Sequence, residues 1–168
     1  MKIAVPTSTR ADFGILYPLI NALQDDPFFE LSLIVTGSHL DESRGNTINE
    51  IVESGFGSVI KMPIEIADTT ELGVSLSAGK TLQSTSLIMS QLRPDMVVIL
   101  GDRYEMLSIA FSCFLFRIPI VHISGGDLTS GSLDDSIRHA ITKLSSLHFT
   151  TTEIYRKRVI QLGEEPNK

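Results

Sequence analysis

Side chains that can exchange protons gather directly after two short apolar runs of the sequence, at residues 96–100 and 119–123. Apolar runs of this length, rich in Val and Ile, are typical of strands buried on both faces of a sheet. In open α/β sheets, ligands bind just beyond the carboxyl ends of such strands. Carboxylates drawn into one cleft there can act as general acid and base. The candidate site residues at these two strand ends are Asp102, Arg103, Glu105, His122, Ser124, Gly125 and Asp127.

A third polar group lies on one expected helix, which begins at Asp134 and Asp135. Acidic side chains favour a helix N-terminus, so one of these two aspartates can serve only as a cap. Arg138 follows at the spacing of an intrahelical ion pair to either aspartate, or it contacts a substrate together with His139. Asp102 has a similar alternative role as a helix cap. The type and spacing of these residues favour acid/base chemistry, with Asp102 as its first candidate.

His122 lies within the second apolar run, and its side chain allows two interpretations. A buried histidine with satisfied hydrogen bonds is the commoner outcome, and a ligand-facing histidine is the alternative. The glycines at 125 and 126 allow a ligand to approach the backbone closely. Residues 124–133, which follow, are rich in Gly, Ser and Thr and are expected to form a loop that moves or wraps a ligand.

Arg10 and His39 extend the candidate site toward the start of the chain. A strand at residues 2–6 leads into a polar loop at 7–14, and a helix with Pro18 in its first turns follows. A loop that enters a helix after a strand is a natural anion site, and the Arg10 guanidinium suits a phosphate. Arg10 can also be a solvated surface residue. His39 follows the second strand and is either a ligand contact or a loop histidine.

Strands and helices alternate along the rest of the chain. The pattern predicts an α/β fold, a doubly wound parallel sheet of about six or seven strands with right-handed crossovers. The helix at 70–92 is rich in small residues, which can allow close helix packing. Its expected inward face is Leu76, Leu82, Leu87, Ile88 and Leu92. The predicted strands lie at 2–6, 30–36, 59–63, 96–100, 119–123 and 147–151, and the predicted helices at 15–23, 46–53, 70–92, 106–116, 134–144 and 152–162.

Composition excludes several classes of function. The 168 residues fit one domain or half of a larger enzyme, and a formal charge of −6 argues against nucleic-acid binding. A single cysteine, Cys113, excludes a disulfide framework and a cysteine-ligated metal. No Gly-x-Gly-x-x-Gly fingerprint supports a dinucleotide, and no cofactor or metal is expected. No apolar run approaches the roughly 20 residues that span a bilayer, and no signal peptide begins the chain, so a cytoplasmic protein is expected.

Taken together, the motifs resemble the hydrolysing UDP-N-acetylglucosamine 2-epimerases, in particular their sialic-acid-pathway branch. The resemblance covers the whole chain. The pairing of residues 122–127 with residues 134–144 is its most specific part. The matching segments are residues 9–14, 36–40, 45–47, 93–95, 101–105, 122–127 and 134–144.

The resemblance implies the N-terminal half of a two-domain GT-B-type fold, with residues 1–168 as one Rossmann-like domain. It implies a cleft between two domains, whose second, nucleotide-binding member is absent from this chain. UDP would leave by elimination across C1 and C2 of the sugar, and water would add to the glycal to give N-acetylmannosamine. Asp102 matches the family's catalytic aspartate, Asp134 and Asp135 match a second acidic position, and Arg10 matches a nucleotide contact.

Two departures leave the substrate open. Ser124 stands where many members have Glu or His, and a serine cannot take over an acid role. Asp127 replaces a frequent Glu and could take part of that role. UDP-linked diacetylated bacillosamine and a GDP-linked sugar are alternative substrates. A non-catalytic binding module and half of a glycosyltransferase are alternative functions. This chain alone is expected to be inactive, and the full-length protein is expected to be a homo-oligomer.

Overall fold

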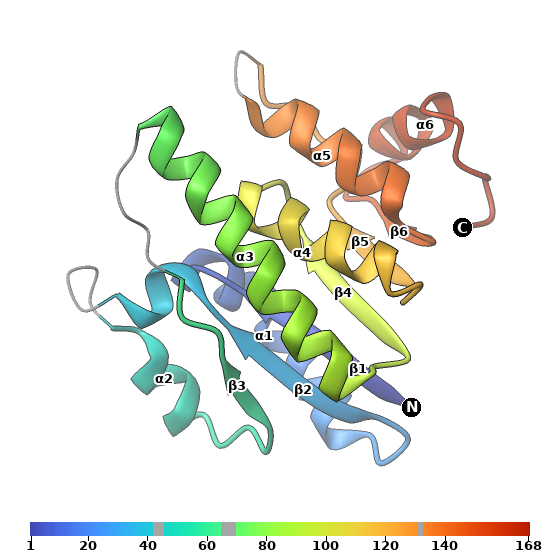
Figure 1. The fold of residues 1–168 in the computed structure, drawn as a ribbon. Coiled ribbons are helices and arrows are strands. Elements are labelled where there is room, and N and C mark those ends of the chain that lie inside the picture. The colour runs from blue at the N-terminus through green and yellow to red at the C-terminus, as the bar shows by residue number, and fades with distance from the viewer. Residues whose placement is uncertain (42–45, 65–69, 131–132) are drawn as a thin grey trace.

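The computed structural model describes residues 1–41, 46–64, 70–130 and 133–168, which form one six-stranded parallel sheet (Figure 1). The strand order is β3-β2-β1-β4-β5-β6, so the winding direction reverses between β1 and β4. The crevice beyond such a reversal is where open α/β sheets bind ligands. The doubly wound α/β prediction is confirmed. The strands are β1 (Lys2–Thr7), β2 (Glu30–Val35), β3 (Val59–Lys61), β4 (Met96–Leu100), β5 (Ile120–Ile123) and β6 (Leu147–Phe149).

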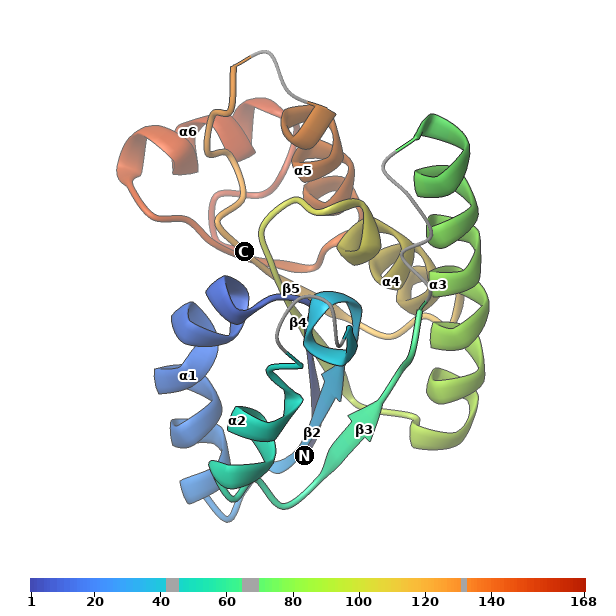
Figure 2. The same cartoon turned by 90° about the vertical axis from the view of Figure 1, so that its left-hand side faces the viewer.

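Helices cover both faces of the sheet, with α1 and α2 on one side and α3 and α4 on the other (Figure 2). Alternate strand residues point to opposite faces, so Ile3 and Val5 join the core under α1, while Ala4 joins the core under α3 and α4. Gly37–Leu40 forms a 3-10 helix, η1. The α-helices are α1 (Arg10–Asp25), α2 (Ile48–Glu53), α3 (Glu71–Leu92), α4 (Tyr104–Leu115), α5 (Leu133–Leu144) and α6 (Glu153–Gln161).

Helix α1 begins five residues earlier than predicted, because a capping box at its start was missed in the sequence. The Thr9 hydroxyl accepts from the Asp12 N–H at 3.2 Å, and an Asp12 carboxylate oxygen accepts from the Thr9 N–H at 3.1 Å. Residues 10–14 are therefore helical, and the predicted loop at 7–14 is wrong for them. Pro18 consequently lies inside the helix rather than in its first turns.

Helix α3 turns only part of the predicted face inward: Ile88 and Leu92 pack against the core, but the most buried stripe is a different one. Leu76 and Leu87 are 56% and 63% exposed, while small residues occupy the buried stripe. The Thr81 hydroxyl donates to the Ser77 carbonyl at 2.8 Å, which satisfies it inside the helix. The small side chains let α3 pack closely on α4, where the Ser86 and Ser112 hydroxyls lie 3.0 Å apart. The buried residues of α3 are Gly73, Ser77, Thr81, Thr85 and Met89.

The other predicted elements are confirmed with small shifts at their ends. Cys113 is fully buried in α4, as expected of a small apolar residue. Strands β2, β3 and β6 end one or two residues earlier than predicted. Three predicted segments extend outside the described residues. They are residues 65–69 of the connection at 64–70, Gly45 of the 45–47 motif, and residues 131–132 of the predicted loop. No helix in the described part of the chain is long and apolar enough to cross a membrane.

Candidate active site

The carboxyl ends of β4 and β5 and the first turns of α5 bring the predicted acidic residues together. Asp102 follows β4 after Gly101, whose φ of 78° turns the chain sharply out of the strand. Asp127 follows β5, and Asp135 lies in the first turn of α5. The carboxylates of Asp102 and Asp135 and the backbone carbonyl of Asp127 surround the Arg138 guanidinium, which lies one turn farther along α5.

Arg138 is the centre of this arrangement, and its side chain is only 7% exposed. Nη2 donates to the Asp102 carboxylate and, at 2.9 Å, to the Thr129 hydroxyl. Nη1 donates to the Asp127 carbonyl at 2.5 Å and lies 3.5 Å from Asp135 Oδ1. The predicted ion pair within α5 is therefore real, but the contact with Asp102 joins residues far apart in the sequence. Burial lowers the pKa of Arg138 from its usual value.

The environments of Asp102 and Asp127 differ in charge. Asp102 is bound to the Arg138 guanidinium, a partner that favours the ionised carboxylate. Asp127 Oδ1 accepts a hydrogen bond from the neutral Thr151 hydroxyl at 2.8 Å. Asp134 is partly exposed, and Asp135 lies 3.6 Å from His139 Nε2. The two carboxylates therefore differ in their partners: Asp102 contacts a cation, and Asp127 contacts a neutral hydroxyl.

Arg103 and Glu105 form an ion pair in which one partner is buried and the other reaches the surface. Arg103 Nη2 donates to Glu105 Oε1 at 2.8 Å, and their side chains are 41% and 1% exposed. Burial acts to lower the pKa of Arg103, but the hydrogen bond and charge of Glu105 outweigh it and raise that pKa. Glu105 is thus enclosed, whereas Arg103 can meet an anionic ligand.

His122 does not reach the surface in this structure. Its ring is fully buried, Nε2 lies 2.8 Å from the Gly101 carbonyl oxygen, and Nδ1 lies 3.1 Å from the Thr142 hydroxyl. Burial lowers the pKa of His122 to about 4. Of the two sequence interpretations, the buried and satisfied histidine is the one observed, and its proposed substrate contact is corrected accordingly.

The glycines after β5 serve packing rather than ligand access. Gly126 has a φ of 82°, and a Cβ there would collide with the Tyr155 carbonyl of α6. Gly125 is buried, and a Cβ on it would lie 3.2 Å from both His122 Nδ1 and Thr142 Oγ1. Ser124 is partly exposed with a φ of 67°, and its N–H donates to the Phe149 carbonyl at 2.8 Å. The expected approach of a ligand to the Gly125 backbone is therefore not supported.

At the start of the chain, Arg10 is accessible and His39 is enclosed. The Arg10 side chain is 74% exposed and pairs with Glu50 at 3.2 Å. His39 is 1% exposed, with its ring nitrogens 3.0 Å from the Thr7 hydroxyl and 2.7 Å from the Thr47 hydroxyl. Burial lowers the pKa of His39, although the charge of Asp12 opposes this. His39 therefore holds β1, η1 and the segment before α2 together.

The predicted anion site at the start of α1 is filled by the protein itself. Asp12 Oδ2 accepts from the N–H groups of Ser8 and Thr9 at 3.2 and 3.1 Å. Because this carboxylate already uses those donors and brings negative charge, the loop does not offer them to a phosphate. The capping-box pattern of Thr9 and Asp12 was the sequence signal that could have shown this.

Three threonines of the site were missed in the sequence. Thr129 contacts Arg138, Thr142 contacts His122, and Thr151 contacts Asp127. Only Thr142 had a usable signal, because it lies one helical turn after Arg138. Thr129 and Thr151 lie on connecting segments whose path depends on the tertiary fold.

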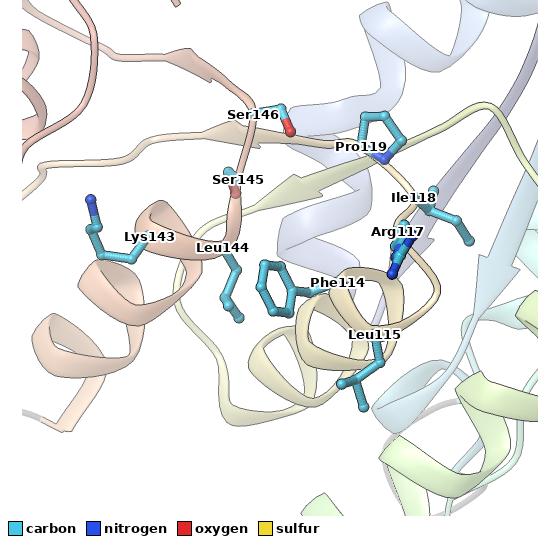
Figure 3. A pocket seen from close by; sticks show the side chains of 9 residues that line it. All are labelled: Phe114, Leu115, Arg117, Ile118, Pro119, Lys143, Leu144, Ser145 and Ser146. Carbon is cyan, nitrogen blue, oxygen red and sulfur yellow. The ribbon is translucent and has the colours of Figure 1, made fainter.

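A pocket of about 530 Å³ lies away from the carboxylates, beside the segment that enters β5 (Figure 3). Phe114 and Leu115 of α4 approach it from one side, and Leu144 of α5 from another. Ile118 and Pro119, which precede β5, place it at the opposite edge of the sheet from Asp102. The described residues contain no group of three His, Cys, Asp or Glu side chains that could hold a metal ion.

Comparisons with known proteins identify the family to which the chain is similar. Residues 21–168 match a family model described as UDP-N-acetylglucosamine 2-epimerase. A Campylobacter jejuni protein described as GDP/UDP-N,N'-diacetylbacillosamine 2-epimerase (hydrolyzing) is 46% identical over 99% of this chain. The polysialic acid biosynthesis protein P7 of Escherichia coli is 42% identical over 98% of it. The chain spans 43% and 42% of the lengths of these two relatives.

The fold also matches a solved structure. The UDP-GlcNAc 2-epimerase of Neisseria meningitidis, crystallised with UDP-GlcNAc, superposes with a TM-score of 0.86 at 19% identity. The match covers all of this chain and 44% of that one. At this level of identity the likeness concerns the fold, which is the Rossmann-like domain described above.

Proposed function

The chain belongs to the UDP-N-acetylglucosamine 2-epimerase family, and we propose that it is the N-terminal domain of a hydrolysing nucleotide-sugar 2-epimerase. One observation carries this proposal: the carboxylates of Asp102 and Asp135 and the backbone carbonyl of Asp127 converge on the buried Arg138 at the carboxyl edge of the sheet. The chain spans less than half the length of these relatives, which supports the proposal of a second domain. That domain would close the cleft and hold most of the nucleotide.

The proposed reaction requires one base and one acid on a two-step path. A base takes the proton from C2 of the sugar while the C1–O bond to UDP breaks, and a C1=C2 glycal forms. Water then adds its oxygen to C1, and C2 receives a proton on the face opposite to the one that lost it. The products are UDP and a free sugar whose configuration at C2 is inverted.

Asp102 is the proposed base. It is 21% exposed and thus reachable, and its partner Arg138 favours the ionised form that a base requires. Asp127, bound to the neutral Thr151 hydroxyl, is the proposed acid. Asp135 supports both through Arg138 and through its hydrogen bond from the Thr129 N–H at 3.4 Å.

Two accessible arginines suit the diphosphate of the substrate. Arg10 is largely exposed, and the exposed part of Arg103 lies beside the catalytic aspartate. A planar guanidinium can bind phosphate oxygens through two parallel hydrogen bonds. We assign both to charge neutralisation of the leaving UDP. Ser124 and His139 remain proposed substrate contacts, and Asp134 remains a proposed acidic group that supports catalysis.

The proposed substrate is a UDP-linked 2-acetamido sugar, with UDP-N-acetylglucosamine as the first candidate for sialic-acid-type biosynthesis. The P7 relative supports that use through its described role. The 46% identical Campylobacter jejuni relative supports UDP-N,N'-diacetylbacillosamine as a second candidate. The full-length protein should release one free 2-epimerised sugar from only one of these two compounds at a substantial rate.

The test is an incubation of the full-length protein with each nucleotide-sugar, followed by separation of UDP and free sugar. Release of UDP together with the C2 epimer supports the proposal. Transfer of the sugar to an acceptor, or binding with no product from either compound, would replace the epimerase with a glycosyltransferase or a binding module.

A further inference from the structure

His122 joins the two backbone segments that carry Asp102 and Arg138. Its Nε2 lies 2.8 Å from the carbonyl oxygen of Gly101, the residue before Asp102. Its Nδ1 lies 3.1 Å from Thr142 Oγ1, which in turn lies 3.0 Å from the carbonyl oxygen of Arg138. One buried imidazole and one hydroxyl therefore connect the exit of β4 to the helical turn of α5 that holds the guanidinium.

The chemistry of these contacts fixes the tautomer of the ring. A carbonyl oxygen can only accept, so Nε2 must carry the hydrogen that is donated to Gly101. In the neutral ring, Nδ1 is then an acceptor, and the Thr142 hydroxyl is its donor. Because that hydroxyl gives its single hydrogen to Nδ1, the link from Thr142 to Arg138 is the one turn of α5 that separates the two residues.

Packing holds this chain of contacts in place without any route to solvent. His122 and Thr142 are both fully buried. Gly125 passes so close that an added Cβ would lie 3.2 Å from His122 Nδ1 and from Thr142 Oγ1. A ring enclosed in this way cannot touch a substrate, but it can determine where the two backbone segments lie.

We propose that His122 and Thr142 are positioning residues, which set the relative placement of Asp102 and Arg138 across the β4–α5 junction. Their importance for turnover rests on the proposed function, because it requires the Asp102 carboxylate to be held by Arg138 in the cleft. Their structural role concerns only the ion pair between Asp102 and Arg138, so it can be measured without an assay of turnover.

Nuclear magnetic resonance of the 168-residue chain tests the proposal directly. Long-range nitrogen–hydrogen spectra of unaltered protein should show His122 as the Nε2–H tautomer at neutral pH. An Nδ1–H tautomer would overturn the proposal, because the Gly101 carbonyl would then have no donor. This measurement needs no variant, so it decides the point even where a substitution prevents folding.

Substitutions at Thr142 provide a second test of the proposal. The Arg138 Nη hydrogens should give separate, slowly rotating signals in the unaltered chain, because both nitrogens are held by acceptors. Thr142→Val removes the hydroxyl at nearly constant shape and should merge these signals. Thr142→Ser keeps the hydroxyl and should restore them, and His122→Gln should reproduce the effect of Thr142→Val.

Thr81 supplies a matched control for loss of a buried hydroxyl. Like Thr142, it is fully buried, and its hydroxyl lies within hydrogen-bond distance of the carbonyl four residues earlier in its helix. Thr81→Val should leave the Arg138 signals unchanged. Unchanged signals in Thr142→Val, or equal changes in both valine variants, would overturn the proposal. Because the signals do not depend on turnover, a failed epimerase assay would not alter this result.

Discussion

Arg138 decides how the acidic residues of the site are used. A buried guanidinium needs compensating charge and acceptors, and here it takes them from Asp102, Thr129, the Asp127 carbonyl and Asp135. The result is one paired carboxylate beside another whose partner is a neutral hydroxyl. Opposite environments for two carboxylates are the usual way in which one site acquires both a base and an acid.

Replacing Asp102 with Asn should abolish the base without unfolding the domain. Arg138 keeps three of its four partners in this variant. In the full-length enzyme we expect kcat to fall by a factor of about 10² to 10⁴, the usual contribution of a general base. Steady-state kinetics and the circular dichroism of the variant provide the measurement. Near-normal kcat in a folded variant would show that Asp102 is not the base.

Replacing Arg138 with Met should cost stability as well as activity. The change leaves the Asp102 carboxylate, which is 21% exposed, without its cationic partner. Breaking a buried ion pair by removing one partner costs about 3 kcal/mol, and the partial exposure of Asp102 keeps the expected loss near or below that figure. Urea unfolding of the 168-residue chain measures it, with Arg156→Met as a control at an exposed ion pair. Equal effects of the two changes would contradict the central role of Arg138.

At the scale of elements, the turn after β5 is the most constrained segment of the site. Gly126 combines a positive φ with close contact to the Tyr155 carbonyl of α6. The segment therefore fixes α6 against β5 and, with it, the position of Asp127. A change of backbone conformation in this segment should therefore affect both the stability of the domain and the position of Asp127, the proposed acid.

Gly126→Ala should destabilise the domain, whereas Gly14→Ala should not. A Cβ at residue 126 would collide with backbone atoms of Tyr155, and alanine would be strained at this positive φ. Together these effects should lower the free energy of unfolding by about 1–3 kcal/mol or more. Gly14 lies inside α1 with open space around it, so alanine there should add up to about 1 kcal/mol through helix propensity. Thermal unfolding of the two variants should move in opposite directions. A shift of the same sign in both would contradict this account.

The sequence was sufficient to predict the order and type of the elements, because buried parallel strands and amphipathic helices leave strong apolar patterns. It was sufficient for the Asp102 and Asp127 positions too, since both follow strand ends. It was only partly sufficient for the inward face of α3, where Thr81 and Thr85, rather than the expected leucines, are fully buried. It also could not decide between the two roles of His122, because burial depends on how α5 and α6 pack.

At the scale of the whole molecule, buried histidines link stability to pH. Burial lowers the pKa of His39, His122 and His148, so the unfolded chain binds more protons than the folded chain below the usual histidine pKa of 6.5. The free energy of unfolding should therefore fall as the pH falls from about 6.5 toward the folded-state values.

His122 should dominate this loss. Its pKa falls from 6.5 to about 4, which corresponds to about 3 kcal/mol of stability lost between those two pH values. Urea unfolding at pH 7, 5.5 and 4 measures the slope, and His122→Gln should flatten it. A free energy of unfolding that stays constant over this range would contradict the buried, neutral state of the ring.

In the proposed enzyme this domain forms one wall of a cleft, and a second domain forms the other. Arg10 and Arg103 remain exposed at the carboxyl edge of the sheet, where a second domain would enclose the diphosphate. The 168-residue chain alone should therefore release no free sugar from either UDP-linked substrate. Enzyme-dependent release by this chain, measured by chromatography, would show that one domain is enough.

The most direct test of the central claim is hydrogen exchange at C2 during turnover in heavy water. The full-length protein should release UDP and a C2-inverted sugar that carries one deuterium at C2, because the proton removed there is replaced from solvent. Asp102→Asn should give neither product nor deuterium. A free sugar with its original hydrogen at C2, or full deuterium incorporation by the Asp102→Asn variant, would contradict the account.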